Sequence, residues 1–372
     1  MITKNIKYFF GNEGKNGFND CFDSLISYLE QKKITQENIL FITIFIQSGK
    51  KDFENKRNEI ENILLEYKLS LPYLIVAQNP FLHEIAIEVQ FAEADFETIK
   101  CNSKLKIIKT DYSKELFASA SINSENTTTE KLFHAIGLIL KENDFEINDI
   151  IRQWNYIEGI FIINDGIQNY QSFNNHRSNF YDKGIWYNGY PAATGIGVVS
   201  GGVSICVHAM KPLKNIIVLP LRNPLQKDAH NYSEQVLVGS GQMIKTTPKF
   251  ERGKIVIYNK KMNVFVSGTA AIVGEQANKD LDAVRQTQVT INNIDRLVDL
   301  KNIRNSFPMI QDFQNVTFNN IRVYIKSTSD FEEVKRICDA HFKNIPIIYL
   351  QADICREELL VEIEANCLNL KI

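Results

Sequence analysis

ELFASASINSENTTTEKLFHAIGLILKENDF, residues 115–145, begins as an apolar run, passes through small residues into a polar loop, and ends with helical spacing. NVFVSGTAAIVGEQANKDLDAVRQTQVTINNIDRLVDL, residues 263–300, follows the same order. The small residues, Ala118–Ala120 and Gly268–Ala271, allow backbone or ligand to approach closely where strand meets loop. A strand–loop–helix unit used twice predicts an internal duplication, although two unrelated units would show the same pattern. The helical spacing rests on Leu132, Ile136, Leu140, Val284, Thr287, Ile291 and Ile294.

The N-terminal third also alternates between strands and helices. Apolar, largely β-branched residues bounded by polar ones predict a buried strand at residues 38–47. Apolar residues at helical spacing predict a helix within residues 50–70. Two further strands are predicted at residues 71–78 and 83–94, the second from its alternation of apolar and polar side chains.

Length and composition are those of an ordinary globular protein. The chain has 372 residues, of which 44% are hydrophobic and 23% charged, so two or three domain-sized units are expected. A formal net charge of −2, without a basic block, argues against a nucleic-acid partner. MITKNIKYFF lacks the pattern of a signal peptide, and no apolar run approaches the roughly 18–20 residues of a membrane helix. Six scattered cysteines predict reduced thiols, so a cytoplasmic protein without a membrane partner is expected.

Two motifs that resemble ligand sites are weak. Cys206 and His208 would share one face of a strand, but such pairs are more often packing residues than metal ligands. No CxxC or HExxH motif accompanies them. TGIGVVSGG, residues 194–202, lacks both the ending of a P-loop and the spacing of a dinucleotide-binding loop. Neither a metal nor another cofactor is therefore expected.

Aromatic side chains are concentrated in residues 150–202, which also contain Arg177. Aromatic walls with a few polar groups are typical of a small-molecule pocket, and an arginine among them suits a carboxylate. An aromatic core between domains, with Arg177 capping a helix, would give the same composition. The aromatic residues are Trp154, Trp186, Tyr156, Tyr170, Tyr181, Tyr187 and Tyr190.

Six separated motifs, in this order, resemble the chorismatase family, whose members convert chorismate into hydroxylated benzoates or cyclohexadienes with loss of pyruvate. The resemblance covers about residue 110 to the end, whereas residues 1–105 match only loosely. The motifs are RQWNYI (152–157), YQSFNNHRSNFY (170–181), YPAATGIG (190–197), NPLQKDAHNY (223–232), VSGTAAIVG (266–274) with QT…NI (286–294), and ADICREELLVEIEA (352–365).

The resemblance implies an α+β fold of tandem YjgF/Rid-like (chorismate-mutase-like) units that form a pseudo-trimer in one chain. Residues 1–150 would form an N-terminal αβ domain without catalytic groups. Residues 151–372 would form a C-terminal Rid-like domain that carries the active site. A monomer or a weak oligomer is expected.

The resemblance also implies a general acid, Glu362, and a residue that selects the product, Cys355. Cleavage of the enolpyruvyl ether begins with protonation of its CH2 carbon, which requires a carboxylic acid that is still protonated near neutral pH. Desolvation supplies such an acid by raising its pKa. By pattern alone, Glu362 and Glu364 would instead line a solvated strand face, and Cys355 would be a buried structural thiol.

Candidate substrate-binding residues complete this expected site. Arg177 would bind a substrate carboxylate beside the Tyr170 hydroxyl, and Thr194 and Gly195 would offer a hydroxyl and a backbone N–H. Gly268, Ala270 and Ala271 would form a small-residue wall against the ring.

Two departures from the pattern of related proteins bear on this site. Many family members have an arginine after the NPxQ motif, but residues 236–244 contain none, so Lys245, Lys254 or Arg356 are candidate replacements. The arginine of Rid deaminases is also missing near Ile347, which disfavours imine hydrolysis.

Three functions follow from these residues. The first is a chorismatase that releases 3-hydroxybenzoate and pyruvate for a secondary-metabolite or aryl-pigment pathway. The second is a hydrolytic chorismatase that releases a dihydroxycyclohexadiene carboxylate. The third is a relative that binds a diacid or aromatic metabolite without converting it. The product, including any 4-hydroxybenzoate, is open at this point.

Overall fold

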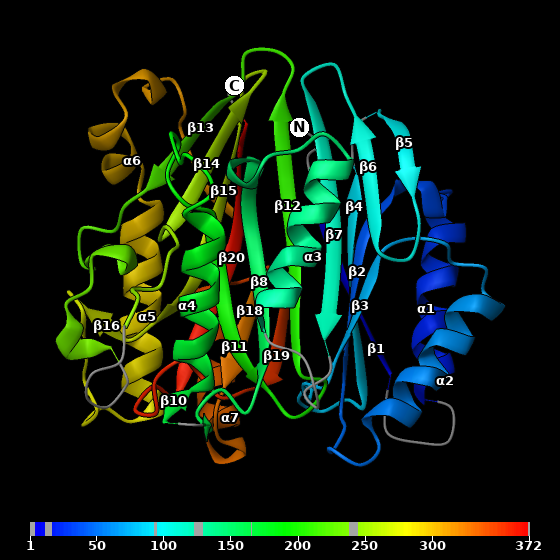
Figure 1. Ribbon diagram of the computed structural model, residues 1–372, viewed down its shortest axis with the longest axis horizontal. Helices are drawn as coiled ribbons and strands as arrows, with labels where there is room; N and C mark the ends of the chain where they lie inside the picture. The colour runs from blue at the N-terminus through cyan, green and yellow to red at the C-terminus, as the bar shows by residue number, and fades with distance from the viewer. Residues whose placement is uncertain are drawn as a thin grey trace.

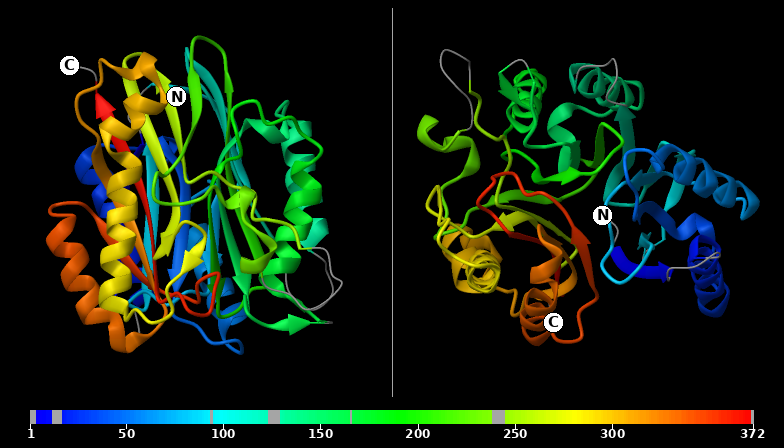
Figure 2. Two further views of the ribbon diagram at one scale, coloured as in Figure 1. Left: turned by 90° about the vertical axis from the view of Figure 1, so that its left-hand side faces the viewer. Right: turned by 90° about the horizontal axis from the view of Figure 1, so that it is seen from below.

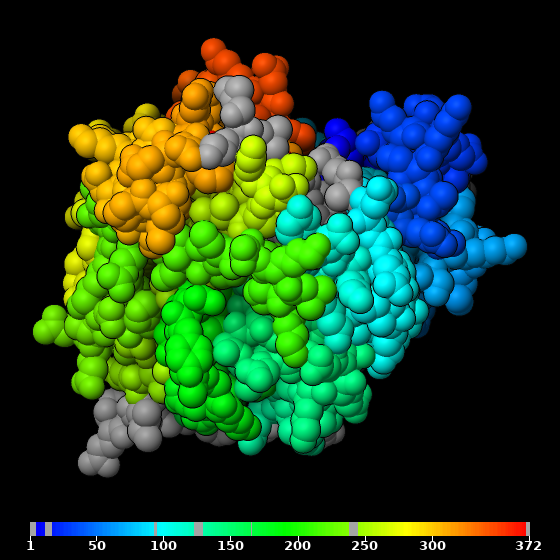
Figure 3. Space-filling view, turned by 90° about the horizontal axis from the view of Figure 1, so that it is seen from above, coloured from blue at the N-terminus to red at the C-terminus, as the bar shows by residue number. Residues whose placement is uncertain are grey.

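The computed structural model of the protein describes residues 4–11, 17–92, 95–122, 129–164, 166–237 and 245–370. Three larger sheets surround a common centre, and helices cover their outer faces (Figures 1 and 2). Figure 3 shows from above how the blue N-terminal residues, the cyan-to-green middle and the yellow-to-red C-terminal residues lie against one another. Within the described residues, no helix is both long and apolar enough to cross a membrane.

The N-terminal sheet has four strands in the order β1-β4-β2-β3, and helices α1 and α2 pack on it. Its elements are β1 (Lys4–Gly11), α1 (Gly17–Lys32), β2 (Ile39–Ile46), α2 (Phe53–Glu66), β3 (Tyr73–Val76) and β4 (Ile85–Ala92). The strand and helix predictions for this third are therefore confirmed, with a helix shorter than residues 50–70 at both ends.

The middle sheet has six strands in the order β11-β8-β12-β7-β6-β5, with α3 and α4 on its outer face. Its elements are β5 (Glu97–Cys101), β6 (Leu105–Lys109), β7 (Ser113–Ile122), α3 (Thr129–Glu142), β8 (Ile150–Glu158), α4 (Asn169–Tyr181), β11 (Ala192–Val198) and β12 (Val203–Pro212). The short pair β9 (Ile163–Asn164) and β10 (Ile167–Gln168) precedes α4. The expected domain boundary between residues 150 and 151 lies at the first residues of β8, and strands from both sides of it form this one sheet. The division into two domains stays a prediction.

The C-terminal sheet has six strands in the order β13-β14-β15-β20-β18-β19, with α5 and α7 in the core on its outer face. Its elements are β13 (Ile217–Leu221), β14 (Gly253–Tyr258), β15 (Lys261–Ala270), α5 (Ala283–Val298), α6 (Leu300–Ser306), β18 (Thr317–Ile325), α7 (Phe331–His341), β19 (Ile347–Gln351) and β20 (Val361–Leu370). A short pair, β16 (Ile272–Val273) and β17 (Gln276–Ala277), follows β15.

The three sheets share one topology. Four strands of each sheet correspond in order, starting from the edge strands β3, β11 and β19. The corresponding orders are β3-β2-β4-β1, β11-β8-β12-β7 and β19-β18-β20-β15. In each case the first pair is parallel and the next two pairs are antiparallel. The two predicted strand–helix units, β7 with α3 and β15 with α5, occupy equivalent places. An α+β fold of tandem units in one chain is confirmed, and the repeated topology extends to a third, N-terminal unit.

A fourth core lies where the inner faces of the sheets meet. It joins Phe45 of the N-terminal sheet, Trp154 and Tyr156 of the middle sheet, and Tyr324 of the C-terminal sheet. The strands that form this centre are therefore buried on both faces, one against helices and one against the other sheets, and all eight residues of β2 are buried. The polar side chains of an inward face, such as Glu88 on β4, are consequently buried as well.

Candidate active site

Strand β20 turns two carboxyl groups toward the centre of the molecule. Because side chains alternate along a strand, Val361 and Ile363 enter the helix-covered core, whereas Glu362 and Glu364 face the other sheets. Their exposed fractions are 3% and 5%. The expectation that the pair lines a solvated face, which the pattern alone favours, is therefore wrong, because β20 is central in its sheet and covered on both sides.

Strand β15 makes room for Glu362 at Gly268. The register between β15 and β20 shifts between Val266 and Thr269, so Gly268 lies in an irregular stretch of the ladder. An ideal Cβ at position 268 would lie 2.0 Å from Oε1 of Glu362. Glycine, which has no Cβ, therefore leaves room at position 268 for the Glu362 carboxyl.

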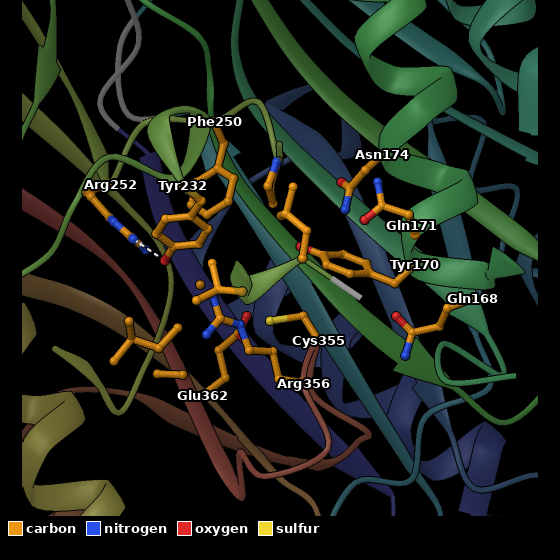
Figure 4. A pocket seen from close by; sticks show the side chains of 16 residues that line it. Gln168, Tyr170, Gln171, Asn174, Tyr232, Phe250, Arg252, Cys355, Arg356 and Glu362 are labelled. Carbon is orange, nitrogen blue, oxygen red and sulfur yellow. Dashed lines mark hydrogen bonds between the residues drawn. The ribbon is translucent and has the colours of Figure 1, made fainter. Parts of the chain in front are cut away.

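A small cavity opens beside Glu362, between the middle and C-terminal sheets. Figure 4 shows three kinds of side chain around it: Tyr170 and amides from α4, Tyr232 and Phe250 opposite, and Cys355 and Arg356 close to Glu362. The lining residues are Gln168, Tyr170, Gln171, Asn174, Tyr232, Val236, Leu237, Pro248, Phe250, Arg252, Gly268, Ala270, Ile272, Cys355, Arg356 and Glu362.

Two arginines share one aromatic ring on the cavity wall. The guanidinium carbons of Arg252 and Arg356 lie 5.4 and 5.2 Å from the ring centroid of Tyr232. Arg252 donates to the backbone oxygen of Lys227 at 2.6 Å and to the Tyr232 hydroxyl (Figure 4). Arg356 donates from Nη1 to the backbone oxygen of Glu275 at 2.9 Å. Within the described residues neither arginine has a carboxylate partner, so both retain charge for an anion in the cavity.

The cavity favours neutral forms of its acid and its thiol. Burial, followed by the charge of Glu364, raises the pKa of Glu362 to about 8, against the opposing pull of Arg152 and Arg252. Burial and the neighbouring Glu362 raise the pKa of the partly exposed Cys355 thiol to about 12. At neutral pH the site therefore presents a carboxylic acid and a thiol.

Comparisons of sequence and of fold with known proteins both find similarity to chorismatases. Residues 98–210 match the family model described as Chorismatase FkbO/Hyg5-like, N-terminal. A crystal structure of a chorismatase superposes with a TM-score of 0.71 at 21% identity, covering 98% of each chain. The chain is therefore similar to chorismatases in sequence over residues 98–210 and in fold along nearly its whole length.

Two curated proteins that this chain resembles come from Streptomyces hygroscopicus. A 3-hydroxybenzoate synthase is 28% identical over 59% of this chain and 64% of its own length. A chorismatase is 30% identical over 58% of this chain and 60% of its own length. The alignments thus span about three fifths of the relatives. A YjgF/YER057c/UK114 family member from Mycobacterium tuberculosis aligns with 33% of this chain at 20% identity and a TM-score of 0.21.

Arg177, the expected carboxylate ligand, lies behind the wall of the cavity. It is 2% exposed and donates from Nη2 to Oδ1 of Asn174 at 2.6 Å, with its guanidinium over the Phe173 ring. Asn174, rather than Arg177, reaches the cavity. Tyr170 does line it, and burial together with the adjacent Cys355 raises the pKa of its hydroxyl.

Thr194 and Gly195 also lie behind the cavity lining. The Thr194 hydroxyl accepts from Nη2 of Arg152 at 2.8 Å and from the backbone N–H of Gly268 at 3.1 Å, and it donates to Glu364. An ideal Cβ on Gly195 would meet the Tyr170 ring at 3.4 Å. Gly268 and Ala270 line the cavity, and the adjacent Ala271 is buried outside the lining.

Arg252 was missed by the sequence reasoning, whereas Arg356 was one of its three candidate replacements. Lys254 donates to the backbone oxygens of Asn188 and Gly189 at 2.7 and 3.0 Å, and it does not line the cavity; nor does Lys245. Val236 and Leu237 line it, but residues 238–244 lie outside the described part of the chain. The available signal for Arg252 was its position directly before a strand, in FERGKIVIY.

Most of the other aromatic side chains of residues 150–202 pack in the cores or against one another. Tyr156 enters the central core, and Tyr181, Trp186 and Tyr190 pack against one another, so only Tyr170 of that set faces the cavity. Nε2 of His208, the residue considered as a metal ligand with Cys206, lies 2.8 Å from Oε2 of Glu115, with which it forms a hydrogen bond. The described residues contain no group of three His, Cys, Asp or Glu side chains suited to a metal.

Proposed function

We propose that this protein is a chorismatase that converts chorismate to 3-hydroxybenzoate and pyruvate. The observation that carries the proposal is a buried carboxyl, Glu362, with a pKa raised to about 8, beside a cavity with two arginines. Chorismate carries two carboxylates and an acid-labile enol ether, and this pairing of cations with a neutral acid matches both features.

The arginine pair would hold the substrate. Arg252 and Arg356 are our candidates for the two carboxylates, with the amides of Gln168, Gln171 and Asn174 available for hydroxyl groups. A dianion held there would bring negative charge near Glu362, which favours its neutral form still more. Binding would therefore strengthen the acid form that the reaction requires.

Glu362 would start the reaction by donating its proton to the CH2 carbon of the enolpyruvyl group. The adjacent carbon then becomes an oxocarbenium centre, which carries the positive charge that the ionised Glu362 partly offsets. The neighbouring ring hydroxyl oxygen then bonds to the ring carbon that bears the ether while the bond from that carbon to the ether oxygen breaks, and the ether oxygen keeps the electron pair and leaves as the keto oxygen of pyruvate. The resulting epoxide opens at its other carbon, and the ring loses one proton to become 3-hydroxybenzoate, which replaces the proton that Glu362 donated. No metal or redox group is needed for this proton transfer.

Cys355 would direct the outcome after protonation. 3-Hydroxybenzoate and pyruvate together contain all the atoms of chorismate, whereas the dihydroxycyclohexadiene product requires one added water. A neutral thiol next to Glu362 occupies space in which a water would otherwise reach the substrate. The relative named 3-hydroxybenzoate synthase supports the aromatic product, and the relatives named chorismatase keep the hydrolytic product as the second candidate.

The test is incubation of the purified chain with chorismate, with pyruvate measured enzymatically and the organic product identified by chromatography and absorbance. An aromatic product with equimolar pyruvate supports the proposal. A diene supports the hydrolytic alternative. Measurable chorismate binding without pyruvate supports a non-catalytic ligand-binding protein and contradicts both enzymatic proposals.

A further inference from the structure

Glu364, the second carboxyl on the inward face of β20, is surrounded by donors. Nη2 of Arg152 donates to Oε2 at 2.7 Å, and Nε1 of Trp154 donates to Oε1 at 2.9 Å. Nη1 of Arg322 lies 3.1 Å from Oε1, and the Thr194 hydroxyl donates to Oε2. These contacts come from β8, β11 and β18, so Glu364 is held from two sheets.

Arg322 carries this network on into the N-terminal sheet. Its Nε donates to Oε2 of Glu88 at 2.6 Å, and its Nη2 donates to Oε1 of the same carboxylate. Its Nη1 also donates to the Tyr156 hydroxyl at 3.1 Å. The side chains of Arg322 and Glu88 are 2% and 1% exposed. Strand β4, which bears Glu88, is the topological counterpart of β20.

The network is electrically balanced without Glu362. Arg152 and Arg322 supply two positive charges, and Glu364 and Glu88 supply two negative charges. Within the described residues no hydrogen bond or ion pair joins the Glu362 side chain to any of them. In a buried site two neighbouring carboxyls do not both ionise, and the one with donors takes the charge.

We propose that Glu364 is a positioning residue that keeps Glu362 protonated, and that Glu88 of the N-terminal sheet maintains this state by balancing Arg322. The proposal deepens the proposed function, on which its catalytic meaning rests. It also gives the N-terminal unit, expected to lack catalytic groups, an electrostatic part in the site.

Other groups face Glu362 and act in both directions. Arg152 from β8 and Arg252 from the segment before β14 favour its ionised form. Arg356, from the turn before β20, lines the same cavity. Tyr170 from α4 and Cys355 are neutral at pH 7, because their pKa values are raised. Glu364 is thus the neighbouring negative charge that offsets the arginines, and Arg322 and Arg152 hold the pKa of Glu364 below its ordinary value despite burial.

The experiment measures the protonation of Glu362 directly, without substrate. Protein with ¹³C-labelled glutamate is titrated by infrared spectroscopy, and the Glu362→Gln spectrum is subtracted to isolate the Glu362 carboxyl. The expected wild-type midpoint is near pH 8. Glu364→Gln should lower it by roughly one to two units, Glu88→Gln by less, and Glu364→Asp should retain most of the wild-type value.

Glu115→Gln is the matched control, because Glu115 is equally buried and ion-paired, with His208, but does not touch Glu362. It should lower stability while leaving the Glu362 midpoint in place. An unchanged midpoint in folded Glu364→Gln would overturn the proposal and leave the network a purely structural link between sheets. If that variant does not fold, neutron diffraction of the wild type decides, since a deuteron on Glu364 instead of Glu362 contradicts the proposal.

The pH dependence of chorismate turnover separates this inference from the function. If wild type releases no pyruvate but the midpoint moves in Glu364→Gln, the function fails and the electrostatic proposal stands. If pyruvate is released and the midpoint does not move, the reverse holds. If the proposed function and the electrostatic proposal are both correct, the pH above which turnover falls should shift in Glu364→Gln by as much as the spectroscopic midpoint. In Glu364→Asp it should return close to the wild-type pH.

Discussion

Gly268 packs directly against the Glu362 carboxyl, and a Cβ at position 268 would lie 2.0 Å from Oε1 of Glu362. Gly268→Ala should therefore force the Glu362 side chain out of its place. Since a side-chain rotation can relieve the clash, we expect a folded protein with kcat lowered by roughly 100-fold, within the range of general-acid contributions. Pyruvate release and thermal unfolding would be measured together.

Gly184→Ala is the control for this substitution, because its new Cβ would meet its nearest neighbour at an ordinary 3.5 Å. It should leave turnover close to wild type. Wild-type kcat in Gly268→Ala would show that the position of Glu362 does not limit the reaction.

The rate of pyruvate release should depend on pH through Glu362. A general acid acts in its protonated form, so kcat/KM should fall as pH rises through about 8, the raised pKa of this carboxyl. Glu362→Gln has no proton to donate and should lose pyruvate release by at least roughly 100-fold. Full turnover by Glu362→Gln would refute its role as the acid.

The free energy of unfolding should also depend on pH through Glu362, and it should fall as pH rises. The pKa of Glu362 rises from an ordinary 4.5 to about 8 in the folded protein, so the neutral acid favours folding. Its contribution is fully present below about pH 4.5 and is lost as pH rises through 8. Denaturant titrations from pH 5 to 9 check this. The free energy of unfolding of the wild type should fall by up to a few kcal/mol over this range, whereas that of Glu362→Gln should not show this fall.

The two arginines on Tyr232 should contribute chiefly to substrate binding. Arg252→Met and Arg356→Met each remove a charged donor while keeping much of the side-chain volume, so KM should rise roughly 10- to 100-fold. Arg177→Met serves as the comparison, because Arg177 lies behind Asn174 rather than in the lining. A larger KM effect from Arg177→Met would restore the carboxylate role expected for it.

Cys355→Ala should change the product more than the rate. Removing the sulfur opens space beside Glu362 for a water, so the fraction of dihydroxycyclohexadiene carboxylate should increase at the expense of 3-hydroxybenzoate. Chromatography of the products with total pyruvate as the reference checks this. Cys355→Ser is the matched control, since its hydroxyl still occupies the space; an identical product ratio in all three proteins would remove Cys355 from product selection.

Much of the local structure was accessible to pattern reasoning. The predicted strand at residues 38–47 is the fully buried strand Ile39–Ile46, and the repeated strand–helix pattern of 115–145 and 263–300 corresponds to equivalent parts of two sheets. These features follow from side-chain periodicity within short segments, which does not depend on distant partners. Burial of Glu362 and Glu364 could not be read from the same periodicity, because an alternating strand shows which residues share a face but not what covers that face.

The sequence by itself determined the alternation of strands and helices, the use of repeated units, and the ordered motifs that resemble the chorismatases. Only the tertiary structure decided that Arg252 lines the cavity, that Arg177 lies behind it, and that Glu88 from the N-terminal third joins the network around Glu364. The physical reason is that protonation and charge pairing depend on burial and on neighbours from other strands, and these exist only once three sheets close around one centre.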